Sequence, residues 1–130
     1  MTSQVQLIEK HRENAETYSE DEICQAKCLQ LLDEISLPNG LLQLVDITEV
    51  GYNRTSGFVW LRQKKKREHF YKDIGKPVTY DKVTAFMEKH RIKKLTGVKS
   101  KDFSIIWVTV CEIYIDDPSN GKITFNKSYL

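Results

Sequence analysis

Two groups of cations are the residues in this sequence that are best placed to do chemistry. They are the run Lys64, Lys65, Lys66 and Arg67, and the group Arg91, Lys93 and Lys94 in a second predicted hairpin. Because neighbouring strands of a sheet lie only ~4.8 Å apart, two basic hairpin ends on one face would focus positive potential on a phosphate, a carboxylate or an anionic membrane. The alternative is a solvated charged turn that discourages edge-to-edge aggregation.

Residues for nucleophilic or acid–base catalysis are sparse. The Gly-x-Ser-x-Gly turn of many ester hydrolases is absent. His69 and His90 are the candidate general bases, but a place on a half-buried strand and a place in a basic turn are the favoured explanations for them. Asp46 and Glu49 stand three apart on a predicted strand and so face opposite sides. We therefore predict no catalytic residue.

The cysteines do not indicate a metal centre. Cys24, Cys28 and Cys111 lack the Cys-x-x-Cys or Cys/His spacing of a zinc site. Free cysteine behaves as a small hydrophobic residue, so reduced core thiols are the prediction. We expect neither a metal nor a cofactor.

Length and charge limit the class of protein. The chain has 130 residues, which suits one domain. Its net charge of +2 conceals a segment, residues 62–101, that carries +10, while the rest of the chain carries −8. No apolar run approaches the ~20 residues of a membrane-spanning helix, and the first residues lack the pattern of a signal peptide. We therefore expect a cytoplasmic protein.

One helix is predicted near the start of the chain. Residues 1–18 are polar and unpatterned, which is typical of a flexible tail, and a single domain is expected over residues 19–130. Ser19 and Glu22 have the capping-box spacing. An apolar stripe then recurs at helical spacing until Pro38 and Gly40, which predicts a helix over residues 20–35.

The remainder of the chain has the period of β-strands. Strands are expected at residues 41–52, 58–61, 68–73, 78–80, 83–88, 92–95, 105–115 and 122–125, separated by turn residues. The first two form a predicted hairpin. These elements favour a mainly β (α+β) fold: an N-terminal helix packed on a compact, largely antiparallel β-barrel or sandwich.

Two of these strands are apolar on both faces. Residues 58–61, and the first half of 105–115, therefore predict central strands with one face in the core and the other under the helix or around a cavity. Trp60 and Trp107 would line or back that cavity. Cations and aromatic residues also interleave as in nucleic-acid-binding proteins, but no single-strand-binding signature appears, so nucleic acid is not favoured.

Several short motifs follow one another in the order of a known family. They are Leu37-Pro38-Asn39-Gly40-Leu41-Leu42, Val50-Gly51-Tyr52-Asn53, Gly57-Phe58-Val59-Trp60-Leu61, Leu95-Thr96-Gly97-Val98-Lys99-Ser100-Lys101 and Gly121-Lys122-Ile123-Thr124-Phe125. In these motifs the chain resembles the plant family of domains of unknown function numbered five-three-eight. The resemblance implies a helix on a β-barrel or sandwich, and it implies that the family's last C-terminal strand is missing.

The resemblance implies little about activity, since family members have no agreed catalytic residues. They are linked to stress responses and likened to lipid-binding proteins and to chlorophyll-hydrolysing esterases. Our leading hypothesis is a non-enzymatic module that binds an amphipathic or lipid-like anionic ligand, or an anionic membrane surface. Its binding residues would be Lys64, Lys65, Lys66, Arg67, Arg91, Lys93, Lys94, Trp60 and Trp107. An ester hydrolase and a protein-interaction scaffold are the alternatives, and the oligomeric state stays open.

Overall fold

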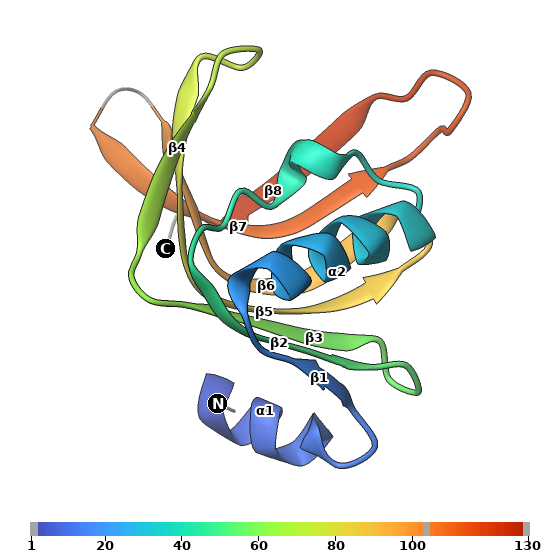
Figure 1. Ribbon diagram of the computed structural model, residues 1–130. Coiled ribbons are helices and arrows are strands. Elements are labelled where there is room, and N and C mark those ends of the chain that lie inside the picture. The colour runs from blue at the N-terminus through green and yellow to red at the C-terminus, as the bar shows by residue number, and fades with distance from the viewer. Residues whose placement is uncertain (1–2, 103–104, 129–130) are drawn as a thin grey trace.

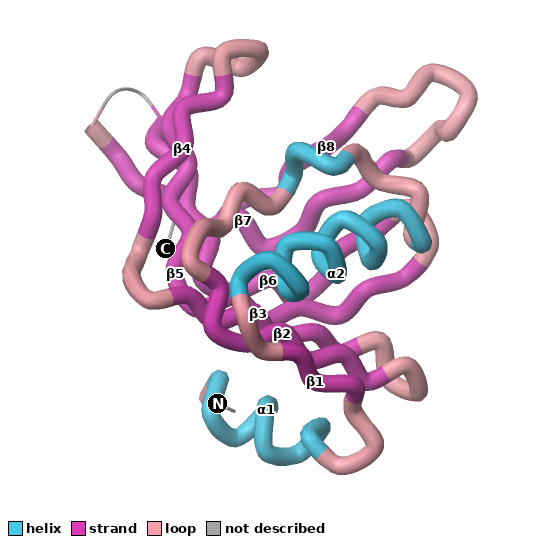
Figure 2. The backbone as a smooth tube through the Cα atoms, viewed as in Figure 1, coloured by secondary structure: helices cyan, strands magenta, loops and turns pink. Residues whose placement is uncertain are grey.

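A curved antiparallel sheet wraps around one helix (Figures 1 and 2). The computed structural model describes residues 3–102 and 105–128. Its helices are α1 (Gln4–Arg12), α2 (Asp21–Glu34) and the short 3-10 helix η1 (Asn39–Leu41). Its strands are β1 (Glu16–Tyr18), β2 (Ile47–Asn53), β3 (Phe58–Gln63), β4 (Arg67–Tyr71), β5 (Lys76–Glu88), β6 (Arg91–Asp102), β7 (Ile106–Ile115) and β8 (Ile123–Ser128).

The eight strands form one sheet in the order β1-β2-β3-β5-β6-β7-β8, and β4 pairs with β5. All pairs are antiparallel, and no pairing joins β1 to β8 within the described residues, so the sheet is open. The mainly β fold with a helix packed on an antiparallel sheet is confirmed.

The main core lies between α2 and the concave face of the sheet (Figure 1). From the helix it takes Cys24, Cys28, Leu31, Leu32 and Ile35. Both helical cysteines are free and buried, as predicted, whereas Cys111 is free but only half-buried. The predicted helical stripe packs on the sheet only in part. Leu32 and Ile35 are buried with Cys28 and Leu31, whereas Ile23, Ala26 and Leu29, which belonged to the same predicted stripe, are exposed.

The N-terminal segment differs from the expected tail, because residues 4–12 form helix α1 on the convex face of the sheet. Ile8 is fully buried there with Phe58 and Trp60 in a second core cluster. Asn53 Nδ2 donates to the His11 carbonyl at 3.0 Å and so holds the end of the helix. Ser3 and Gln6 form a capping box at its start. That box was a signal for a helix in the sequence itself.

The expected capping box at Ser19 and Glu22 does not form. The N-cap of α2 is Glu20, at φ 75°, without a side-chain hydrogen bond. The chain turns sharply there from β1 into the helix. Asp21 instead accepts a hydrogen bond from the Ile47 backbone N–H at 2.8 Å, which ties the first turn of α2 to the start of β2. A tertiary hydrogen bond, and not the expected local cap, therefore fixes the start of α2.

Several strand bounds also differ from the prediction. Residues 41–46 are not a strand, since η1 and an irregular segment precede β2. The expected strands 78–80 and 83–88 are one strand, β5, whose pairing with β6 shifts register between Tyr80 and Thr84. Gly97 lies within β6 rather than in a turn: it has φ +83°, and a Cβ there would collide with the Lys82 carbonyl. The irregularity in β5 is what brings Lys82 so close.

Candidate functional site

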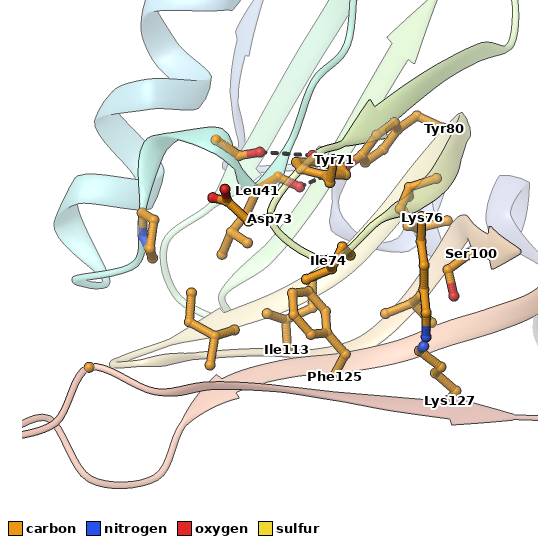
Figure 3. A pocket seen from close by; sticks show the side chains of 17 residues that line it. Leu41, Tyr71, Asp73, Ile74, Lys76, Tyr80, Ser100, Ile113, Phe125 and Lys127 are labelled. Carbon is orange, nitrogen blue, oxygen red and sulfur yellow. Dashed lines mark hydrogen bonds between the residues drawn. The ribbon is translucent and has the colours of Figure 1, made fainter. Parts of the chain in front are cut away.

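A cavity of about 450 Å³ opens on the concave face, between the η1 segment, the β4–β5 hairpin and strands β5 to β8 (Figure 3). Its volume lies in the usual range of small-molecule pockets, ~300–1,000 Å³. Most of the wall is apolar. The apolar lining includes Leu41, Ile74, Val78, Val98, Val110, Ile113, Ile123 and Phe125.

Two tyrosines tie the η1 segment to the sheet at this cavity. Tyr71 Oη donates to the Gly40 carbonyl at 2.8 Å, and Tyr80 Oη donates to the Leu41 carbonyl at 3.0 Å. The two hydroxyl groups also contact each other (Figure 3). Burial raises the pKa of both phenols, so both are neutral donors at ordinary pH.

A lysine–aspartate cluster stands at another part of the wall. Lys127 Nζ lies 3.1 Å from Asp102 Oδ1, and Lys76 Nζ lies 3.2 Å from the same oxygen. Only 5% of the Asp102 side chain is exposed, against 18% for Lys127. Figure 3 shows the two ammonium groups side by side at the edge of the cavity. The cavity thus combines a mostly apolar wall with cationic donors.

Strand alternation explains this arrangement. Ile123, Phe125 and Lys127 follow one another at period two along β8, so they share the concave face. Val78 pairs with Ser100, and Ser100 with Val108, which extends the same face across β5, β6 and β7. Lys76 and Lys127 were not among the predicted site residues. The alternation of residues 123–127 was the available signal.

A second pocket, of about 460 Å³, lies on the convex face, and it gathers part of the predicted site. Lys66, Arg67 and Trp107 line it, together with Glu68, Thr79 and Lys99. Lys101 Nζ stands 5.8 Å above the Trp107 ring. Lys64 and Lys65 are exposed on the same β3–β4 connection. The first basic cluster and Trp107 are therefore neighbours.

The second basic cluster lies elsewhere. Arg91 and Lys93 belong to the β5–β6 hairpin and both pair with Glu88, and Arg91 also pairs with Glu112. Lys94 lies 5.5 Å from the centre of the Phe86 ring. In the register of the sheet, Arg67 lies opposite Tyr80, near the middle of β5. Arg91 lies opposite Glu88, at the end of the same strand. The structure does not bring the two clusters together.

Trp60 lines neither pocket. It is fully buried beneath α1, and its Nε1 donates to Glu49 Oε1 at 2.8 Å. Burial alone would raise the pKa of Glu49, but this hydrogen bond and the neighbouring guanidinium of Arg12 keep it below its usual value. Trp60 therefore belongs to the second core cluster.

The candidate bases are not joined to a nucleophile. His69 packs edge-on against Tyr71, with 4.6 Å between ring centroids, and His90 occupies the β5–β6 turn at φ 62°. Neither histidine side chain shares a hydrogen bond with a Ser, Thr or Cys side chain within residues 3–102 and 105–128. In the same part of the chain, no three His, Cys, Asp or Glu side chains are grouped to hold a metal ion.

These features define a mainly β domain with an apolar cavity between a rolled sheet and the η1 segment. The chain belongs to the family described as "Protein of unknown function, DUF538", whose model matches residues 28–130. This is the family that the sequence motifs resemble. No match was found among curated proteins or among solved structures. None of the described helices is long and apolar enough to cross a membrane.

Proposed function

We propose that this protein binds an amphipathic, lipid-like ligand with an anionic end in the concave cavity, without catalysis. The observation that supports the proposal most is the presence of the Lys127 ammonium group on a cavity wall that is otherwise mostly apolar. An apolar tail would bury its surface against Val98, Val110 and Phe125, which is worth roughly 25 cal/mol per Å².

The anionic end would lie at Lys127. An ammonium group carries three N–H donors, so Lys127 can donate to a ligand anion while it keeps its contact with Asp102. Lys76 lies beside it on the same carboxylate. The neutral tyrosine hydroxyls already donate to the Gly40 and Leu41 carbonyls. Charge recognition is therefore assigned to the lysines and not to the tyrosines.

The experiment compares two ligands that differ in charge, laurate and lauryl alcohol, by calorimetric titration. We expect laurate to bind more tightly. Lys127→Gln should weaken laurate by about tenfold or more, since hydrogen bonds to charged groups contribute ~1.5–3 kcal/mol, and should leave lauryl alcohol unchanged. Lys122→Gln is the matched control, because Lys122 is exposed just before the same strand and does not line the cavity.

A second variant tests the cavity itself. Val98→Phe places a larger side chain where Val98 lines the wall, so both ligands should bind more weakly while the circular dichroism spectrum stays native. Binding of neither ligand, or binding that Val98→Phe leaves unchanged, would contradict the proposal.

A further inference from the structure

Exposed apolar side chains gather at one end of the sheet. Eight large apolar side chains are exposed among the described residues, and five of them belong to this end: Phe70, Ile74, Ile105, Ile106 and Trp107. We call these five residues the apolar tip. Ile105 is 80% exposed and Phe70 is 56% exposed. Single exposed apolar residues are ordinary on a protein surface, but a group of them at one end is typical of an interaction site.

The strand register explains why they lie together. Tyr71 pairs with Lys76, so Ile74 lies in the tight connection between β4 and β5. Val78 pairs with Ser100, and Asp102 pairs with Ile106, so β6 ends and β7 begins at the same end of the sheet. In Figure 1 the β4–β5 hairpin and the ends of β6 and β7 project from this side of the molecule.

Cations border the apolar tip on the convex face. Lys66, Arg67 and Lys99 share the second pocket with Trp107, and Lys101 stands over the Trp107 ring. Lys64 and Lys65 extend this group, which we call the basic border. No ion pair between described residues uses any of these six side chains. Arg91 and Lys93, in contrast, are neutralised by Glu88 and Glu112.

We infer that the apolar tip and its basic border form a docking surface for an anionic lipid bilayer. Tryptophan and aliphatic side chains enter the boundary between head groups and acyl chains, and nearby lysines are attracted to anionic head groups. Charge complementarity favours this partner over an uncharged surface. Exposed isoleucines beside the cations favour it over nucleic acid, which is contacted by cations and stacked by aromatic rings.

The docking surface and the proposed ligand site use different charged residues. Lys76 and Lys127 line the concave cavity, and neither belongs to the basic border. Docking therefore does not depend on a ligand in the cavity. Ile74 is common to both, because it lines the cavity and belongs to the tip. A bilayer bound at the tip would lie next to the β4–β5 side of the cavity.

The test mixes the full chain with phosphatidylcholine vesicles, with or without phosphatidylserine, and follows co-sedimentation and tryptophan fluorescence. The chain has two tryptophans, and Trp60 is fully buried. A blue shift on vesicle addition would therefore come from Trp107. We expect the shift and the binding only with phosphatidylserine, weaker at higher salt, and quenching of Trp107 by lipids brominated in the acyl chain.

Two variants address the two parts of the surface. The triple change Lys64→Gln, Lys65→Gln, Lys66→Gln should weaken binding by roughly a hundredfold, at ~1 kcal/mol for each cation near the membrane. Its control changes three exposed lysines elsewhere, Lys10, Lys89 and Lys122, to Gln. Ile105→Gln should weaken binding, whereas Leu29→Gln, an exposed apolar residue of α2, should not.

The inference would be overturned by equal binding with and without phosphatidylserine, by no binding, or by equal losses in the test and control variants. Binding to single-stranded RNA in place of vesicles would also overturn it. Val98→Phe should leave vesicle binding unchanged, so a failure of the proposed ligand site and a failure of the docking surface give different results.

Discussion

The indole ring of Trp60 lies against Gly51, its direct partner across strands β2 and β3. A Cβ at position 51 would overlap the six-membered part of that ring. Since Trp60 also donates to Glu49 and is fully buried, it cannot move aside without losing these contacts. Glycine is required here for space and not for an unusual backbone angle.

Gly51→Ala should therefore lower the free energy of unfolding by about 1–3 kcal/mol, as other overpacked cores do. Urea unfolding followed by far-ultraviolet circular dichroism measures the loss. Gly40→Ala is the matched control, because the nearest atom to a Cβ there is at an ordinary distance, 3.5 Å, on a flexible side chain. Equal losses in the two variants would contradict the role of Trp60.

Helix α1 should contribute strongly to stability through Ile8. This side chain is fully buried against Phe58 and Trp60, so Ile8→Ala should cost about 2–5 kcal/mol. Val5→Ala, in the same helix but with Val5 56% exposed, should change stability by less than ~0.5 kcal/mol. If both variants unfold at the wild-type urea concentration, α1 does not dock in solution.

Acid stability should depend on Glu16. A hydrogen bond from Tyr18, with help from Arg54 and Lys27, lowers the pKa of Glu16 from 4.5 to about 2. A carboxylate with a lowered folded-state pKa stabilises the protein above its unfolded value, and that contribution disappears as the pH falls from 4.5 towards 2.

Replacement of Glu16 by Gln should therefore make the melting temperature less dependent on pH across that window. Glu13→Gln, at an exposed position without an ion pair among the described residues, should keep the wild-type slope. A Glu16→Gln profile parallel to that of the wild type would show that these contacts do not persist in solution.

Tyr80 and Tyr71 should act as a coupled pair. Tyr80→Phe removes the donor to the buried Leu41 carbonyl and should cost about 1–3 kcal/mol. Because the two hydroxyls contact each other, the double variant with Tyr71→Phe should cost less than the two single variants together. Tyr114→Phe, a half-buried tyrosine elsewhere in the sheet, serves as the control. Strict additivity would contradict the coupling.

Local pattern was sufficient for the elements with a strong period. Apolar residues at helical spacing, among them Cys28, Leu31 and Leu32, predicted α2, although Ile23 and Leu29 of the same pattern are exposed. The apolar run around Phe58 and Trp60 predicted a central strand covered on both faces. The β2–β3 hairpin also forms as expected. These predictions succeed because helical and strand periods bring side chains to fixed faces whatever the rest of the chain does.

Which segment packs against each face of a helix or strand, in contrast, was decided only by the tertiary structure. The sequence alone predicted that both faces of the strand at Trp60 are buried. It did not predict that the polar N-terminal segment covers one of these faces through Ile8. It showed two basic clusters but not that β5 separates them and that Glu88 and Glu112 neutralise one. Lys127 reaches the cavity only through the register of β7 with β8. Register and long-range packing depend on the whole sheet at once, and no short stretch of sequence contains them.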